Sequence, residues 1–386
     1  MPIPNAHLRS KRILVAHNVE RHGKGGMARL IENMHTALEP YGWQIDYFTA
    51  DDVAAIGSHR MRRFGFPWYL RCHVRNAFLR GEPYSIVNVH EPAGAAVVVA
   101  RERLGRPAIV AMSYGVEQRY WEIRLDKALG MDDAPGRKER ITVPLLSLWQ
   151  SRMTLRRADH IFCNNQQDRG YLESQMHVDS ARITHVFSGA GPEFATAAPR
   201  RIYARPCTKL LFSGTWIVRK GIRQVVAAFA ELAARNVDLQ LGVLGAGVPS
   251  ARVLADFPPP LHSRVTVLPP MSHDECAEVL LDYDIFLLPS FFEGTPLALI
   301  EAMCTGIPAI TTNTAGMRDV VQDGMNGIFV TPGNAGQIVR AVEQLCIDAD
   351  LRQRLGRRAA QDASLTYTWQ ALGALVHQAY SNLIGS

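Results

Sequence analysis

The sequence predicts an α/β protein with two doubly wound domains, each built on a parallel sheet. Short apolar runs alternate with amphipathic stretches of helical periodicity along the whole chain. The 386 residues suffice for two domains of ordinary size. The alternation lapses once, at residues 189–199, and this lapse indicates a linker.

The first series of strands begins with the apolar run at 13–16. A helix is expected next, because apolar side chains recur on one helical face at Met27, Leu30, Ile31, Met34 and Leu38. Further strands are expected at 45–49, 86–89, 108–112 and 160–163. This series predicts one parallel sheet for the N-terminal half of the chain.

The second series lies beyond the linker and predicts the second sheet. Its strands are expected at 210–212, 239–244, 265–268, 285–288, 309–312 and 328–330. A last amphipathic stretch, at 367–384, predicts a closing helix. Apart from this doubling of the fold, the sequence has no internal repeat.

Composition excludes several classes of protein. With 47% hydrophobic and 20% charged residues, the chain is an ordinary globular protein. No apolar run approaches the roughly 18 residues of a spanning helix, and the basic N-terminal residues lack the apolar stretch of a signal peptide. The six cysteines are scattered without a CxxC pair, so we expect reduced thiols in a cytoplasmic protein rather than a zinc site or a disulfide framework.

The most informative segment is the strand, turn and helix at 284–306. The apolar run that ends at Pro289 predicts a buried strand. Thr295 is expected to cap a helix and Pro296 to occupy its first position, where a missing N–H costs nothing. Gly306 is expected to end this helix. The free N–H groups and the positive end of the helix dipole then favour an anionic ligand such as a diphosphate.

Two glutamates flank this turn. Glu293 lies just ahead of it, and Glu301 lies about 7.5 Å up the helix from Pro296. A carboxylate there accepts hydrogen bonds from neutral hydroxyls but repels phosphate. The arrangement therefore suits a ligand with both kinds of group, a sugar joined through a diphosphate to a nucleoside. The alternative is that both glutamates are solvated acids at a helix end.

The spacing of the two glutamates, together with the Gly-Thr-Pro turn, Gly316 and the segment Asp323-Gly324-Met325-Asn326-Gly327, resembles the glutamate-x7-glutamate signature of family GT4 of retaining glycosyltransferases. The resemblance extends over about residues 11–382. It implies the GT-B fold, in which two Rossmann-like domains face each other across a cleft and ligands lie at the carboxyl ends of both sheets.

The resemblance also implies domain bounds and residue roles. An N-terminal acceptor-binding domain would span 1–196, a C-terminal nucleotide-sugar-binding domain 197–366, and a helix at 367–386 would pack back on the first domain. Glu293 would contact the transferred sugar as a catalytic residue, and Glu301 the ribose of the nucleotide. The donor would also contact the turn itself, at Gly294, Thr295, Pro296 and Leu297.

A second donor-binding segment, 211–221, contains Gly214, Arg219 and Lys220. By resemblance, Lys220 is the catalytic lysine that binds the donor diphosphate, where a fixed ammonium stabilises the charge that develops as the glycosyl–phosphate bond breaks. The family often has an arginine at the position of Thr215, so Arg219 is expected to supply the second cation. The alternative for Lys220 is a solvated lysine at a helix start, which the helix dipole disfavours.

Two glycine-rich loops accompany these segments. Gly25 and Gly26 follow the first strand and, by resemblance, reach over the donor phosphates, although such turns are also common for topological reasons. The loop Leu244-Gly245-Ala246-Gly247 has the start of a dinucleotide-binding motif, but Ser250 replaces its third glycine. We interpret this second loop as lying near the nucleotide base.

The acceptor side is expected at strand ends of the N-terminal domain. Many relatives have a histidine near the reacting sugar where this chain has Tyr114, and Glu117 follows closely. His90 also ends a strand and either lines the acceptor site or is a core or helix-capping histidine. No nucleophile and no hydrolase-like pair of carboxylates is evident. The family's front-side displacement needs no protein base, because the leaving phosphate can take the acceptor proton.

Residues 1–200 carry a net charge of +7 and the remaining residues −1, which gives the net charge of +6 for the chain. Residues 53–81 contain no acid but six arginines, interleaved with aromatic side chains. This stretch is expected to contact an anionic membrane through 58–80. It equally suits a phosphorylated acceptor, or an arginine-rich helix pair with aromatic side chains in the core. Nucleic acid is not expected as a partner, because no recognition motif accompanies the charge.

Together these features predict a retaining glycosyltransferase that moves a sugar from a UDP- or GDP-linked donor to a glycan or lipid-linked acceptor. We expect it to act in bacterial surface or exopolysaccharide synthesis, in the cytoplasm at the inner face of the membrane. No metal or other cofactor is expected, because no DxD motif ends a strand. The alternatives are a sugar phosphorylase or nucleotide-sugar epimerase on the same fold, and a catalytically idle subunit that binds glycan or nucleotide.

Overall fold

A computed structural model describes residues 11–20, 26–54, 59–131, 133–235 and 238–385. The described residues form two compact units. Unit 1 contains those up to Glu122, together with Pro135–Ser188 and the segment from Trp369 onward. Unit 2 contains Ile123–Ala134 and Gly189–Thr368.

The sheet of unit 1 has six parallel strands in the order β2-β1-β3-β4-β5-β6. Their bounds are β1 Arg12–Ala16, β2 Gln44–Phe48, β3 Ile86–His90, β4 Ala108–Ser113, β5 His160–Cys163 and β6 Ile183–His185. The first five lie within one residue of the strands predicted from the sequence. The sequence does not predict β6, because its residues Ile183-Thr184-His185 include one apolar side chain and form no apolar run.

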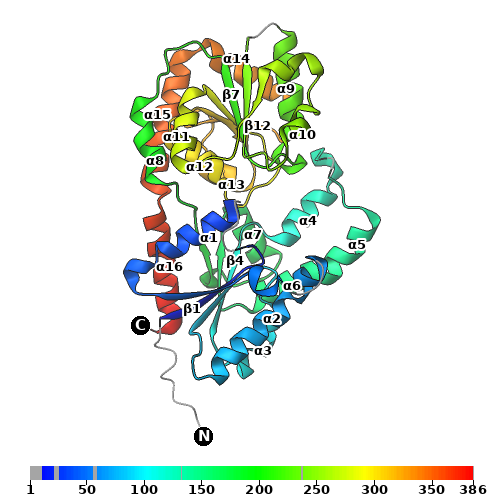
Figure 1. Ribbon diagram of the computed structural model, residues 1–386, viewed down its shortest axis with the longest axis vertical. Coiled ribbons are helices and arrows are strands. Elements are labelled where there is room, and N and C mark those ends of the chain that lie inside the picture. The colour runs from blue at the N-terminus through cyan, green and yellow to red at the C-terminus, as the bar shows by residue number, and fades with distance from the viewer. Residues whose placement is uncertain (1–10, 21–25, 55–58, 132, 236–237, 386) are drawn as a thin grey trace. The chain divides into compact units, whose positions relative to one another are not determined.

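Helices cover both faces of this sheet (Figure 1). Their bounds are α1 Gly26–Thr36, α2 His59–Leu79, α3 Ala95–Ala100, α4 Glu117–Leu125, α5 Arg137–Val143, α6 Trp149–Arg157, α7 Gln166–Ser174 and α16 Trp369–Ile384, and a π-helical turn, η6, at Pro144–Leu148 joins α5 to α6. α1 and α16 pack with Ile13 and Val15 of β1, whereas α2, α3 and α6 pack with Leu14 and Ala16. Burial on both faces explains why β1 has a continuous apolar run instead of an alternating pattern.

The closing helix α16 belongs to the core of unit 1. Leu372, Val376 and Tyr380 are buried against the sheet. The side-chain amide of Asn88, on β3, donates a hydrogen bond of 2.5 Å to the Tyr380 hydroxyl. This bond satisfies two polar groups that would otherwise be buried without a partner, so it fixes α16 on the strand.

Unit 2 repeats the architecture with the strand order β12-β11-β10-β7-β8-β9, again all parallel. Its strands are β7 Lys209–Ser213, β8 Gln240–Leu244, β9 Val265–Val267, β10 Ile285–Leu288, β11 Ala309–Thr312 and β12 Ile328–Val330, each within one residue of its predicted position. Its helices are α8 Pro192–Ala197, α9 Ile222–Ala234, α10 Ser250–Leu254, α11 His273–Asp282, α12 Leu297–Cys304, α13 Ala315–Val320, α14 Ala335–Ile347 and α15 Ala349–Thr366. In Figure 1, α9 and α10 lie on one side of this sheet and α11 and α12 on the other.

The bounds of the units differ from the predicted domains 1–196, 197–366 and 367–386. Unit 2 begins at Gly189, because α8 packs on α11 and α12 of that unit. Residues 123–134 also belong to unit 2, where the Leu129 carbonyl lies against Gly333. These contacts join segments that are far apart in the sequence, so local periodicity gives no sign of them.

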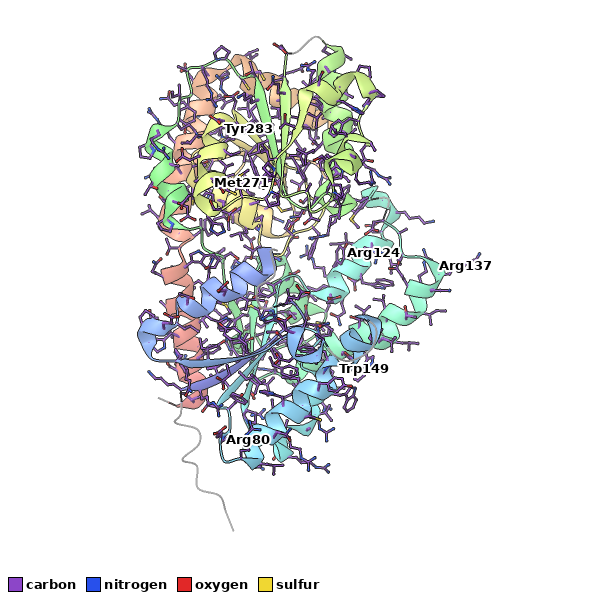
Figure 2. All side chains as sticks on the ribbon, viewed as in Figure 1. Arg80, Arg124, Arg137, Trp149, Met271 and Tyr283 are labelled. Atoms are coloured by element: carbon purple, nitrogen blue, oxygen red, sulfur yellow. The ribbon has the colours of Figure 1, made fainter. Side chains whose placement is uncertain are left out.

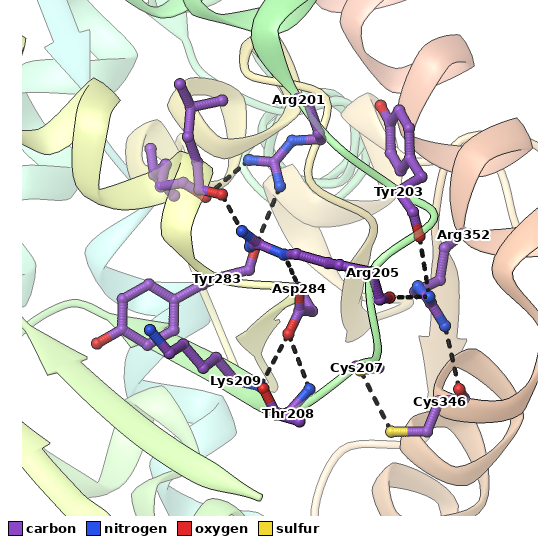
Figure 3. Close-up of polar contacts among 12 residues, drawn as sticks. Arg201, Tyr203, Arg205, Cys207, Thr208, Lys209, Tyr283, Asp284, Cys346 and Arg352 are labelled. Carbon is purple, nitrogen blue, oxygen red and sulfur yellow. Dashed lines mark hydrogen bonds and ion pairs between the residues drawn. The ribbon is translucent and has the colours of Figure 1, made fainter.

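Two arginines, one of them buried, hold the segment that leads into β7 in place (Figure 3). Arg201 is only 8% exposed and donates to the carbonyls of Leu280, Tyr283 and Thr305. Burial lowers the pKa of Arg201 to about 10, which still leaves it charged at neutral pH. Arg205 pairs with Asp284 at 2.7 Å, directly ahead of β10. The start of β10 is therefore fixed to the segment ahead of β7, its neighbour in the sheet.

Candidate functional site

In unit 2 the two predicted catalytic residues, Lys220 and Glu293, lie close together at the point where the strand order reverses. The chain leaves β7 towards β8 and β9, and then returns to β10 on the other side of β7. The loops that follow β7 and β10 therefore diverge at the carboxyl ends of two adjacent parallel strands. Such a switch point is where open parallel sheets bind their ligands.

An ion pair occupies this switch point. Nζ of Lys220, in the loop after β7, lies 2.8 Å from Oε1 of Glu293, in the loop after β10. Nη1 of Arg219 lies 3.6 Å from the same oxygen. The side chains of Lys220 and Glu293 are only 14% and 8% exposed. Burial by itself would raise the pKa of Glu293, but Lys220 and Arg219 hold it below its usual value. Glu293 is therefore an ionised hydrogen-bond acceptor next to a fixed ammonium.

The backbone explains how two loops hold this pair in place. Gly221 has φ 75°, a conformation that favours glycine, and a Cβ there would lie 2.2 Å from the Pro289 carbonyl oxygen. Only glycine at this position therefore lets the loop after β7 come so close to the end of β10. The Phe291 N–H donates to the Arg219 carbonyl at 2.8 Å, and the Arg219 guanidinium donates to the Phe292 carbonyl at 2.7 Å. These contacts join the two loops on either side of the ion pair.

The turn after Glu293 differs from the prediction by one residue. α12 begins at Leu297 with Pro296 as its N-cap, so Thr295 lies one position ahead of the cap. The reason is that the Leu297 N–H bonds the Thr295 carbonyl, which closes a tight turn ahead of the helix. The helix ends at Thr305 and Gly306, as predicted.

The start of α13, which follows β11, packs behind this turn. The Gly316 N–H donates to the Glu293 carbonyl at 3.0 Å. A Cβ at Gly316 would lie 2.2 Å from the Gly294 carbonyl oxygen, so a larger residue would push the turn out of place. Glu301 is half-buried on α12, one turn beyond the segment Gly294–Leu297. The roles of these residues in binding a donor remain predictions.

Other predicted residues have mixed outcomes. The loop Leu244–Gly247 lies beside the β7 loop, since the Gly214 and Trp216 N–H groups donate to the Leu244 and Ala246 carbonyls at 2.8 Å each. Gly214 itself lies beneath the Lys220 side chain. In the Asp323–Gly327 segment, the Asp323 carboxylate accepts a hydrogen bond from the Phe329 N–H, which fixes a turn ahead of β12. Gly25 lies outside the described residues, and Gly26 begins α1.

Unit 1 has its own switch point, between β1 and β3. His90 ends β3, and its ring centroid lies 4.8 Å from that of Tyr114, which follows β4. Burial lowers the pKa of His90 well below 6.5 and raises the pKa of Tyr114, so both are neutral at physiological pH. Among the described residues neither His90 Nε2 nor the Tyr114 hydroxyl has a hydrogen-bond partner. Buried polar atoms of this kind usually bind a water molecule or a ligand.

Sequence reasoning missed the carboxylate next to His90. Oε1 of Glu91 accepts hydrogen bonds from the Ser113 hydroxyl at 2.9 Å and from the Glu117 N–H at 3.3 Å, and Oε2 accepts from the Ser151 hydroxyl at 2.6 Å. Burial raises the pKa of Glu91 to about 8. The available signal was its place directly after a buried strand. Glu117, predicted on the acceptor side, is the first residue of α4, and its backbone N–H donates to the Glu91 carboxylate.

This architecture, two parallel-sheet units with candidate residues at each switch point, is that of the GT-B glycosyltransferases. Two family profiles match the sequence: "Glycosyl transferases group 1" over residues 206–362 and "Glycosyltransferase Family 4" over residues 24–194. The chain therefore belongs to the group 1 glycosyl transferases of family GT4.

Curated relatives share part of the chain. The chain is 27% identical over 253 residues to an alpha-D-kanosaminyltransferase of Streptomyces kanamyceticus. This alignment covers 61% of this chain and 63% of that protein. The chain is 28% identical over 267 residues to a D-inositol 3-phosphate glycosyltransferase of Mycobacterium marinum, over 67% of this chain and 56% of the relative. The matches thus span less than two thirds of either relative.

Solved structures agree in fold. Sucrose-phosphate synthase from Thermosynechococcus elongatus superposes with a TM-score of 0.78 at 19% identity, covering 98% of this chain and 100% of that one. WaaG, a glycosyltransferase of lipopolysaccharide biosynthesis, superposes with a TM-score of 0.72 at 16% identity, over 97% and 100% of the two chains. Anabaena HepE, solved with UDP-glucose, gives 0.66 at 13% identity, over 96% and 99%.

Proposed function

We propose that the protein is a retaining glycosyltransferase that uses a nucleoside diphosphate sugar as donor. The observation that carries this proposal is the Lys220–Glu293 ion pair at the switch point of unit 2. In such a donor the anomeric carbon and the nearest phosphorus share one bridging oxygen. A cation that binds the phosphate and a carboxylate that binds the sugar hydroxyls must therefore be close neighbours, as this pair is.

Each charged residue then has a distinct task. Lys220, with Arg219 beside it, stabilises the charge on the departing diphosphate, and this stabilisation grows as the bond breaks. Glu293 stays ionised and accepts hydrogen bonds from sugar hydroxyls. Glu301 accepts them from the ribose. The acceptor oxygen bonds to the anomeric carbon on the face from which the phosphate departs, the glycosyl–phosphate bond breaks, and the leaving phosphate takes the acceptor proton. Configuration is therefore retained without a protein nucleophile. We expect no metal requirement.

The acceptor binds at the switch point of unit 1. His90 and Tyr114 are uncharged there and offer hydrogen-bonding atoms without partners among the described residues. Such atoms suit hydroxyl groups of a glycan or a lipid-linked sugar better than a free phosphate. The names of the similar proteins, an alpha-D-kanosaminyltransferase, a D-inositol 3-phosphate glycosyltransferase and a glycosyltransferase of lipopolysaccharide biosynthesis, support a range of acceptors. We place the protein in bacterial surface or exopolysaccharide synthesis, in the cytoplasm.

The decisive test is incubation of the full chain with UDP-, GDP- and ADP-sugars. Slow release of free sugar is expected from one donor without any acceptor, with retained anomeric configuration by NMR and no loss of rate in EDTA. The same donor's nucleoside diphosphate should raise the melting temperature by mass action. Turnover that requires added orthophosphate would identify a phosphorylase, and sugar interconversion without net transfer an epimerase. If a nucleotide raises the melting temperature but no donor is turned over, the protein is a catalytically idle subunit that binds nucleotide.

One surface of unit 1 suits an anionic membrane. No helix in the described part of the chain is long and apolar enough to cross a bilayer. On α2, however, Trp68 is 55% exposed and the Arg71 guanidinium lies 6.0 Å from its ring, whereas Phe66 is buried in the core. α2 packs on α3 and α3 on α6, where Trp149 is 45% exposed (Figure 2). Aromatic side chains among arginines are typical of interfacial contact with acidic lipids.

Flotation with liposomes tests this contact. The full chain should float with vesicles that contain phosphatidylglycerol and stay behind with pure phosphatidylcholine. Replacing Arg71 and Arg75 together by glutamate should abolish most of the flotation, because each charge near the surface contributes about 1 kcal/mol. Arg354→Glu, an exposed site on α15 of unit 2, is the matched control and should change nothing. Equal recovery with both lipids would contradict the proposed contact.

A further inference from the structure

Two cysteines that are far apart in the chain meet in unit 2. Cys207 lies in the segment ahead of β7, and Cys346 lies near the end of α14. They are 139 residues apart, yet their Sγ atoms are 3.3 Å apart and share a hydrogen bond (Figure 3). Both are free thiols and both are only partly buried, so small solutes can reach them.

A buried arginine holds the two segments together. Nη1 of Arg352 donates to the carbonyls of Leu345 and Cys346, at 2.5 and 3.1 Å. Nη2 donates to the carbonyls of Tyr203 and Arg205, at 3.0 and 2.9 Å. The Arg352 guanidinium is thus hydrogen-bonded to the backbone near each of the two cysteines. Arg352 is only 4% exposed. The short separation of the thiols is therefore built into the packing of the unit and does not depend on two loose side chains.

The environment distinguishes the two thiols. The hydrogen bond with Cys207 and the positive charge of Arg352 lower the pKa of Cys346. The same hydrogen bond and burial raise the pKa of Cys207. Since the thiolate is the reactive form, Cys346 is the attacking sulfur and Cys207 the resolving one.

We propose that Cys207 and Cys346 form a redox modification site, at which a hydroperoxide converts the two thiols into a disulfide that closes most of unit 2 into a covalent loop. The loop contains every strand of the unit, from β7 to β12, and with them Lys220 and Glu293. A cross-link of this length removes more conformational freedom from the unfolded chain than a short one does.

The chemistry balances in two steps. The Cys346 thiolate attacks one oxygen of the hydroperoxide, the O–O bond breaks, and the second oxygen leaves as water or an alcohol after taking a proton; Cys346 becomes a sulfenic acid. The sulfur of Cys207 then attacks the sulfenic sulfur, an S–S bond forms, and the S–O bond breaks to release water with the Cys207 proton. The two thiols have lost two electrons to the peroxide. A dithiol reverses the change by thiol–disulfide exchange.

Peptide mapping of the full chain after treatment with hydrogen peroxide tests the proposal. The wild type should yield a peptide pair linked through Cys207 and Cys346, and dithiothreitol should remove it. Cys207→Ser should instead accumulate sulfenic acid on Cys346, trapped by dimedone. Cys346→Ser should form no linked pair, and dimedone should trap Cys207 in it more slowly than it traps Cys346 in Cys207→Ser. Cys72→Ser removes an exposed thiol of unit 1 and should leave the link unchanged.

The melting temperature supplies an independent measurement. Oxidised wild type should melt several degrees above the reduced protein, and oxidised Cys207→Ser should not. The proposal is overturned if peroxide oxidises Cys72 while Cys207 and Cys346 both remain open to alkylation. It is equally overturned if the linked peptides join two copies of the chain, which intact mass under non-reducing conditions distinguishes.

Discussion

Replacing Lys220 by alanine is expected to lower turnover by about 10²–10³-fold, the usual loss for one group that stabilises developing charge in a water-excluded site. The ammonium lies 2.8 Å from Glu293 and is largely buried, so no solvent cation takes its place. The KM for the donor should change less than kcat, because the interaction strengthens as the phosphate leaves. Initial rates of donor hydrolysis or transfer over a range of donor concentrations measure both quantities.

Three further variants make this experiment specific. Glu293→Ala should also lower mainly turnover, whereas Glu301→Ala should mainly weaken binding of the nucleotide. Lys209→Ala is the matched control, because Lys209 starts β7 at the other end of the same strand and should leave the rates unchanged. Near-normal rates in the variants of Lys220, Glu293 and Glu301 alike would remove the proposed donor site, provided that the variants melt like the wild type.

The second large effect is expected on stability. Burial raises the pKa of Glu91 from 4.5 to about 8. Between these pH values the folded protein keeps a proton that the unfolded chain releases, so the free energy of unfolding falls as pH rises, by roughly 1.4 kcal/mol per unit. Below pH 4.5 both states hold the proton, and above pH 8 the loss is complete. Its total is about 5 kcal/mol.

Glu91→Gln should remove this loss, because the amide keeps the shape of the protonated acid and does not ionise. Urea unfolding should give similar stabilities for variant and wild type near pH 4.5. Near pH 8.5 the variant should be more stable by a few kcal/mol. Glu102→Gln, an exposed glutamate of unit 1, is the control and should show no such pH dependence. A difference between Glu91→Gln and wild type that stays constant with pH would show that Glu91 ionises normally.

The central strands of both sheets were predictable because they are buried on two faces and read as continuous apolar runs bounded by turn residues. The reversal of strand order at β7 and β10 was not visible, yet it is what brings Lys220 and Glu293 together. Their proximity was anticipated only through the resemblance to a family. Thr295 was misplaced by one position, because the generic preference for Pro at the first helical position ignores the turn that Leu297 closes.

Other features depend on contacts that no local pattern reveals. Apart from its place after a buried strand, nothing in the local sequence separates Glu91 from a surface glutamate. Its distinguishing feature is that the hydroxyls of Ser113 and Ser151, distant in the sequence, donate hydrogen bonds to its carboxylate. The scattered cysteines correctly indicated free thiols, but the spacing of Cys207 and Cys346 could not show that α14 returns to the start of β7. The same holds for residues 123–134, which belong to unit 2 by contacts far away in the sequence.

The position of α16 has a consequence for how this chain is made. During translation, Ile13, Val15 and Met112 emerge before unit 2, but α16, which packs on them, emerges after it. Unit 2 is synthesised in between and can close on its own residues first. The nascent sheet of unit 1 therefore lacks the cover of α16 on this face while unit 2 is being synthesised.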